Sequence, residues 1–137
     1  MTSFHDAAGA DTRSAITRTA AALFVRHGYD ATSMDRIAVE AKVARQTIYN
    51  QFENKEALFR AIVMGLADEA VMPLAATRKG APVRATLLAL ARSILSTALR
   101  PSTLAVHRLV VAETARFPDL GKTIYAAGAA RAMAQLA

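Results

Sequence analysis

The 137-residue sequence contains no cysteine and no tryptophan, and it has only 6 glycines and 4 prolines. The absence of cysteine excludes disulfides, thiolate zinc sites and cysteine nucleophiles. No uninterrupted apolar run approaches the roughly 20 residues that a membrane-spanning helix requires. The first 12 residues also lack the basic and apolar segments of a signal peptide. We therefore expect a cytoplasmic chain without membrane association.

Acidic residues are fewer than basic ones, which gives the chain a net charge of +6. A basic balance favours a nucleic-acid partner. Most of the excess lies in the second half, because residues 1–60 hold 8 basic and 7 acidic residues whereas residues 61–137 hold 9 and 4. A DNA-binding interpretation must therefore depend on where particular side chains stand rather than on bulk charge.

Strand-like alternation bounded by turn residues is missing from the sequence, and apolar residues recur with helical spacing instead. We therefore predict an all-α protein. The expected helices span about residues 12–27, 33–40, 44–51, 55–71, 83–99, 102–115 and 119–135, after a loose tail at residues 1–9. Good N-cap residues precede three of them: Thr32 and Ser33, Asn54, and Ser102. The stretch from Pro73 to Pro82 is expected to be a linker.

The two short helices at 33–40 and 44–51 are separated by about three residues, which is typical of a helix-turn-helix at about residues 33–52. Two helices joined this tightly must cross closely, and the small residues Ala38 and Ala41 allow it. A small core would be completed by Ile37, Val43 and Ile48.

The second helix of this motif has two unlike sides. At about 100° per residue, Ile48, Phe52 and Ala44 share one side and are expected to be buried. Gln46 and Asn50 fall on the opposite side. The exposed face then consists of polar residues: Arg45, Gln46, Thr47, Tyr49 and Asn50.

This face has no carboxylate, because no Asp or Glu occurs between Lys42 and Glu53. Its composition suits the major groove of DNA, where Gln and Asn amides pair with adenine, Arg with guanine, and a Thr methyl group with thymine. The Tyr49 hydroxyl and Lys55 suit phosphates. The hydroxyls of Thr32 and Ser33, with the free amides at the helix start, form a second candidate phosphate site.

At this point the sequence resembles a known family. The residues that carry the resemblance are Thr32-Ser33-Met34-Asp35-Arg36-Ile37-Ala38, Ala41-Lys42-Val43-Ala44, Thr47-Ile48-Tyr49 and Phe52-Glu53-Asn54-Lys55-Glu56-Ala57-Leu58-Phe59. They look like the DNA-binding domain of the TetR family of bacterial transcriptional regulators, over about residues 10–70. The remaining residues, 71–137, would then form part of a helical ligand-binding and dimerisation domain.

The resemblance implies a homodimer that represses transcription from a palindromic double-stranded operator. By position, the expected DNA-binding residues are Thr32, Ser33, Lys42, Arg45, Gln46, Thr47, Tyr49, Asn50 and Lys55. Two residues depart from the family pattern. Lys42 stands where the family often has Gly, so we expect a left-handed backbone that costs roughly 1 kcal/mol. Ala44 stands where Ser is common, and the missing side-chain cap costs roughly 1 kcal/mol.

The second part, especially Leu109 to Leu120, is similar to one regulatory-domain subgroup of the family. The resemblance implies a small-molecule effector there, and the few polar groups favour an apolar or aromatic one. The candidate lining residues are Leu66, Leu87, Leu90, Ile94, Leu109 and Tyr125, although ordinary core is the more common role for apolar residues of this kind. Family members usually continue beyond the point that corresponds to Ala137, so we expect a homodimer where further C-terminal helices are present.

Two other classes of protein were weighed. An enzyme is not expected, because His5, His27 and His107 lie on different elements and no nucleophile, phosphate-loop or metal-binding motif occurs. We therefore predict no catalytic residue, no metal ligand and no cofactor. A helical protein-interaction module without DNA binding stays open, because residues 1–60 are nearly neutral.

Overall fold

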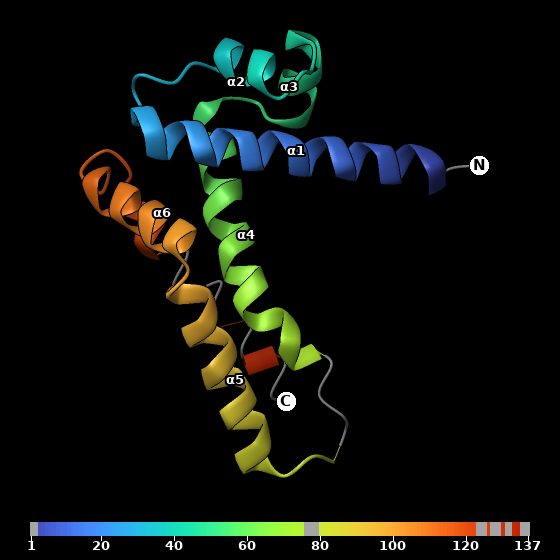
Figure 1. The fold of residues 1–137 in the computed structure, drawn as a ribbon, viewed down its shortest axis with the longest axis vertical. Helices are drawn as coiled ribbons and strands as arrows, with labels where there is room; N and C mark the ends of the chain where they lie inside the picture. Colours follow the sequence, from blue (N-terminus) through green and yellow to red (C-terminus); the bar gives the residue numbers. More distant parts are fainter. Residues whose placement is uncertain (1–2, 76–79, 123–125, 127–129, 131–132, 135–137) are drawn as a thin grey trace. The chain divides into compact units, whose positions relative to one another are not determined.

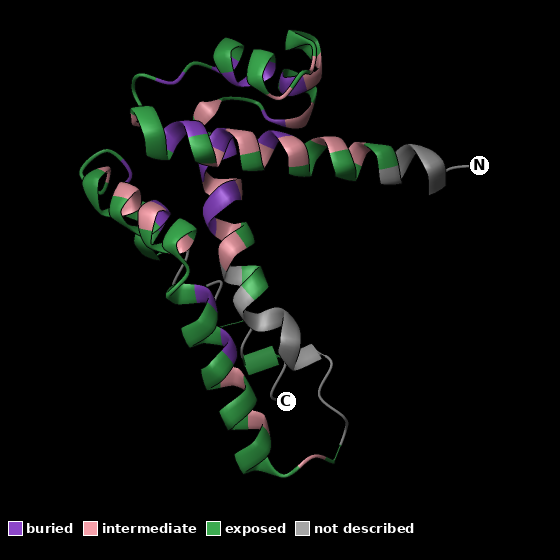
Figure 2. Ribbon diagram, in the orientation of Figure 1, coloured by how far each residue is buried: buried purple, intermediate pink, exposed green. Residues whose placement is uncertain are grey.

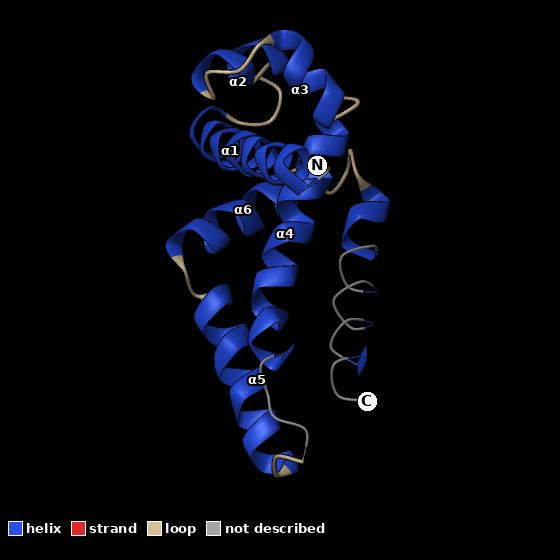
Figure 3. Ribbon diagram, turned by 90° about the vertical axis from the view of Figure 1, so that its right-hand side faces the viewer, coloured by secondary structure: helices blue, strands red, loops and turns tan. Residues whose placement is uncertain are grey.

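The computed structural model of the chain describes residues 3–75, 80–122, 126, 130, 133 and 134. Figure 1 shows the helices and Figure 3 shows that loops join them, with no strand in the described ranges. The helices are α1 (Ser3–His27), α2 (Met34–Glu40), α3 (Arg45–Gln51), α4 (Lys55–Ala75), α5 (Val83–Ala98) and α6 (Pro101–Ala112). Residues 118–122 are also helical. The prediction of an all-α fold is confirmed.

The chain divides into two compact units, Met1–Ile62 and Val63–Ala137. The division falls inside α4 and eight residues before the expected boundary at residue 70. No helix in the described part of the chain has both the length and the apolar character needed to cross a membrane.

The expected loose tail at residues 1–9 is wrong, because α1 already begins at Ser3. Ala7, Ala8 and Ala10 explain the earlier start, since alanine has the highest helix propensity. The predicted linker also begins later than expected, because α4 continues past Pro73 to Ala75. The centre of the predicted linker, residues 76–79, lies outside the described residues.

The first unit has an apolar core built from α1, α2, α3 and the start of α4 (Figure 2). Three aromatic rings meet within it, with centroids 5.4 Å apart for Phe24 and Tyr29, 5.9 Å for Phe24 and Phe59, and 5.4 Å for Tyr29 and Phe59. Tilted and edge-on ring pairs of this kind add about 0.5–1.5 kcal/mol each beyond burial. The rings join α1 to the first turns of α4, and α2 and α3 lie on the same side of α1 (Figure 1).

In the second unit, α5 buries an unexpected face. Ser93 and Thr97 are only 9% and 4% exposed, whereas Leu95 and Leu99 are 57% and 66% exposed. The helix has apolar residues around its whole circumference, so apolar side chains remain exposed whichever face packs. The expected Ser102 cap is also wrong, because α6 begins at Pro101. Proline suits the first helical position, where its missing N–H is not needed.

Candidate nucleic-acid interface

The turn between α2 and α3 has the backbone that the sequence predicted. Lys42 has a φ of +58° and is the only non-glycine residue with positive φ in the described ranges. The Val43 N–H donates to the Ala38 carbonyl over 3.0 Å, which closes the turn. Ala38 is buried and Ala41 half-buried, in keeping with a close approach of the two helices. The Lys42 side chain is exposed to solvent.

The faces of α3 also follow the prediction, except at Ala44 and Thr47. Ile48 and Phe52 are 0% and 3% exposed, and they anchor the helix in the core of the first unit. Gln46 and Asn50 are exposed on the other side. Ala44 was expected to be buried but is exposed, because it is the N-cap with an extended backbone (φ −68°, ψ 150°) and lies outside the helical periodicity. It makes no side-chain cap hydrogen bond, because its methyl group has no hydrogen-bond acceptor.

The exposed side chains of α3 form two small groups. Arg45 Nε lies 3.1 Å from Asp35 Oδ1 of α2, and the Arg45 guanidinium carbon lies 5.8 Å from the centre of the Tyr49 ring. Gln46 Nε2 donates to Asn50 Oδ1 over 3.0 Å. Thr47, at the edge of the helix opposite Arg45 and Tyr49, was expected to be exposed but is half-buried. These residues, Arg45, Gln46, Thr47, Tyr49 and Asn50, are called the α3 polar face below.

Only one of the two hydroxyls expected to contact phosphate at the start of α2 is exposed to solvent. Ser33 is exposed and is the N-cap, and its Oγ accepts from the Arg36 N–H over 3.1 Å. Thr32 is fully buried, and its hydroxyl donates to the Gly28 carbonyl over 2.9 Å, with the Leu23 carbonyl at 3.3 Å. A buried hydroxyl cannot reach a phosphate, so the prediction that Thr32 contacts DNA is wrong.

Lys55 likewise has a partner within the protein. Its Nζ donates to the Tyr29 carbonyl over 2.9 Å and lies 4.4 Å from the centre of the Tyr29 ring. The side chain is half-buried and ties the first residue of α4 to the loop after α1. These contacts give Lys55 a cation–π and hydrogen-bonding role within the protein, and they use one of its three N–H groups, so the prediction that Lys55 binds phosphate stays a prediction.

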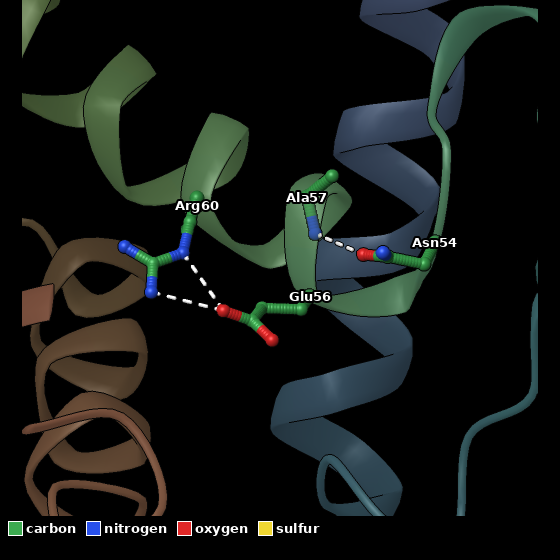
Figure 4. Close-up of polar contacts among 4 residues, drawn as sticks. All are labelled: Asn54, Glu56, Ala57 and Arg60. Carbon is green, nitrogen blue, oxygen red and sulfur yellow. Dashed lines mark hydrogen bonds and ion pairs between the residues drawn. The ribbon is translucent and has the colours of Figure 1, made fainter.

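The first turns of α4 hold the end of the motif in place (Figure 4). Asn54 is the predicted cap, and its Oδ1 accepts from the Ala57 N–H over 2.8 Å. One turn later, Arg60 contacts Glu56 Oε1 through Nε at 3.1 Å and through Nη2 at 2.9 Å. Both interactions span three or four residues, so they stabilise the helix start locally.

Three residues in or beside the motif make contacts with another helix that were not predicted from the sequence. Arg13 of α1 donates through Nη1 to the Gln51 carbonyl over 2.8 Å, and its guanidinium carbon lies 4.2 Å from the centre of the Phe52 ring. The positive charge of Arg13 at this position also interacts favourably with the partial negative charge at the C-terminal end of α3. Arg36 lies 3.1 Å from His27 Nε2, and Asp35 pairs with Arg45. The contacts span 9 to 39 residues, which helical periodicity cannot reveal.

The residues proposed for an effector pocket come from α4, α5 and α6 of the second unit. Leu66, Leu90 and Leu109 are half-buried. Leu87 and Ile94 are 49% and 42% exposed. Tyr125 lies outside the described residues. The five described residues therefore place apolar side chains on helix faces that are partly exposed to solvent.

Two family models match the chain. Residues 16–62 match the model described as bacterial regulatory proteins, tetR family. Residues 85–137 match the model of the C-terminal domain of AefR-like transcriptional repressors. The first range contains the whole of α2, the turn and α3.

Individual proteins agree with these matches. YhgD of Bacillus subtilis (strain 168), an uncharacterised HTH-type transcriptional regulator, is 41% identical over 70 residues, which are 46% of this chain and 37% of YhgD. A TetR-family regulator structure from Mesorhizobium loti has a TM-score of 0.67 at 30% identity, covering 93% of this chain and 65% of that one. The flavonoid-responsive regulator FrrA has a TM-score of 0.71 at 31% identity, with the same coverage. The chain therefore spans about a third to two thirds of the length of these relatives.

Proposed function

The chain belongs to the TetR family of bacterial regulatory proteins, and on this basis we propose that it regulates transcription by binding double-stranded DNA through α3. The observation that carries the proposal is the α3 polar face, which is exposed and free of carboxylates while Ile48 and Phe52 hold the helix from the other side. A short helix with this division can lie in a major groove without exposing apolar residues.

Each residue of the face has a role that follows from its chemistry. Arg45 suits guanine, and the amides of Gln46 and Asn50 suit adenine. The Gln46–Asn50 hydrogen bond leaves the carbonyl oxygen and one N–H of Gln46, and both N–H groups of Asn50, for a base edge. Thr47 offers a methyl group to thymine.

Phosphate contacts come from the residues at the edges of the motif. Lys42 is exposed in the turn, and Tyr49 has a hydroxyl at the rim of the face. Ser33 is exposed at the start of α2. Such contacts set affinity and orientation on the duplex rather than sequence preference.

The family supports a cytoplasmic homodimer that represses transcription from a palindromic operator, and the second family model is that of repressors. In a two-fold dimer the two α3 helices enter successive major grooves about 34–36 Å apart. Symmetry of the protein would then appear as symmetry of the DNA site.

The second unit is proposed to bind an apolar or aromatic effector. FrrA is described as responsive to flavonoids, which are aromatic. Apolar side chains on α4, α5 and α6, among them Leu66, Leu90 and Leu109, are the candidates for contacting it. Any effector must bind the DNA-binding conformation and the other conformation with different affinities. A ligand that binds both equally does not shift the equilibrium between them.

A randomised-duplex selection with the full-length protein tests the proposal. We expect an enriched palindrome whose binding weakens steeply with salt, and Arg45→Ala or Gln46→Ala should each weaken it by roughly 5- to 150-fold. Arg18→Ala is the matched control, because Arg18 is an exposed cation of α1 away from α3.

A selection with no enriched duplex would contradict DNA binding and favour the helical interaction module. An enriched duplex whose affinity is unchanged by both α3 variants would instead contradict the choice of α3.

A further inference from the structure

The ion pair between Asp35 and Arg45 joins the first turn of α2 to the first residue of α3. Arg45 Nε lies 3.1 Å from Asp35 Oδ1, and the two side chains are 72% and 60% exposed. The Tyr49 ring faces the same guanidinium, with its centre 5.8 Å from Arg45 Cζ. The guanidinium is therefore held between a carboxylate of one helix and an aromatic ring of the next turn.

Folding stability does not explain this pair. Exposed ion pairs contribute little, because water screens both charges and two side chains must be ordered. A carboxylate is also unfavourable beside DNA, whose phosphates repel it. Asp35 is the one acidic residue that pairs with the α3 polar face among the described residues.

The geometry leaves the DNA-binding atoms of Arg45 available. The guanidinium has five N–H donors in a fixed planar arrangement. Asp35 lies on the Nε side, and within the described residues neither terminal nitrogen of Arg45 donates a hydrogen bond. Two terminal nitrogens in one plane match the O6 and N7 acceptors of guanine.

We propose that Asp35 is a positioning residue for Arg45, holding it by its Nε side so that the terminal nitrogens bind guanine rather than a nearby phosphate. The proposal rests on the proposed DNA binding through α3. It assigns to Asp35 a part in base discrimination, while its charge lowers affinity for any DNA.

Base discrimination and affinity for any DNA can be measured separately in one experiment. The preferred duplex of the 137-residue chain is first selected, and dissociation constants are then measured for every single base-pair change in one half-site. Asp35→Asn, Arg45→Ala and the double variant are compared on this series and on an unrelated duplex. Glu40→Gln is the matched control, because Glu40 is an exposed carboxylate of the same helix that has no ion pair in the described part of the chain.

We expect one G·C pair at which the wild type discriminates by roughly 5- to 150-fold, and Arg45→Ala to abolish that preference. Asp35→Asn should reduce it by at least about threefold, with no further loss in the Arg45→Ala background, since the effect acts through Arg45. Affinity for the unrelated duplex should stay the same or rise. Glu40→Gln should leave the preference unchanged.

A wild-type preference that persists in Asp35→Asn would overturn the assignment while leaving DNA binding intact. So would a uniform loss of affinity on every duplex, which indicates a merely structural role. Asp35→Ala is measured in parallel, because alanine has the highest helix propensity, and it decides the question if Asp35→Asn loses helix content by circular dichroism. A selection without any enriched duplex would overturn both this assignment and the proposed function.

Discussion

Replacing Lys42 tests the strain in the turn of the helix-turn-helix. Its φ of +58° lies in the left-handed region, which costs a residue with a Cβ about 1–2 kcal/mol relative to glycine. Glycine in turn loses about 0.5–1 kcal/mol more backbone entropy than alanine on folding. We therefore expect Lys42→Gly to be about 0.5–1 kcal/mol more stable than Lys42→Ala.

The comparison of the two variants isolates the backbone effect. Both remove the same exposed side chain, which makes no hydrogen bond to any residue in the described ranges. The free energy of unfolding is measured in urea by circular dichroism. Ala22→Gly is the control, because Ala22 is exposed in the middle of α1 and should lose about 1 kcal/mol on the same change of residue type. Glycine should thus stabilise the turn and destabilise the helix.

A Lys42→Ala variant more stable than Lys42→Gly by about 0.5–1 kcal/mol would refute the reasoning, because only the entropy cost of glycine would then remain and the left-handed backbone would carry no penalty. DNA binding gives an independent result. If Lys42 contacts a phosphate, both variants should lower the slope of log K against log salt by about 0.9. Equal slopes in all three proteins would remove Lys42 from the interface without affecting the stability argument.

Two further predictions concern residues that proved to be internal. Thr32→Val should lower the free energy of unfolding by about 1–3 kcal/mol, because it removes the hydroxyl that donates to the part-buried Gly28 carbonyl and lies 3.3 Å from the Leu23 carbonyl. Thr32→Ser should retain most of the stability, and equal losses in both variants would exclude the hydrogen bond as the cause. Lys55→Met should cost about 1–2 kcal/mol through loss of the Tyr29 contacts. It should leave the salt slope of DNA binding unchanged, and a shallower slope with full stability would show that Lys55 binds phosphate after all.

The helix-turn-helix could be predicted because its determinants are local. The Ser33 and Asn54 caps, the positive φ at Lys42 and the burial of Ile48 each depend on residues within three or four positions. The exposed polar character of α3 follows from the same periodicity. The start of α1 was missed, because apolar periodicity marks only the part of a helix that packs on a core, whereas alanine-rich turns extend it further.

The sequence by itself therefore determined the helices, the turn and which side of α3 meets solvent, since these depend on backbone periodicity and short-range hydrogen bonds. Only the tertiary structure decided which polar side chains remain free. Lys55 suits a phosphate by type, yet its Nζ also donates to the Tyr29 carbonyl 26 residues away. Asp35 looked like an ordinary helix-start acid, yet it pairs with Arg45 because α2 and α3 cross at that point. Such contacts depend on distances between separate helices, which no pattern along one helix contains.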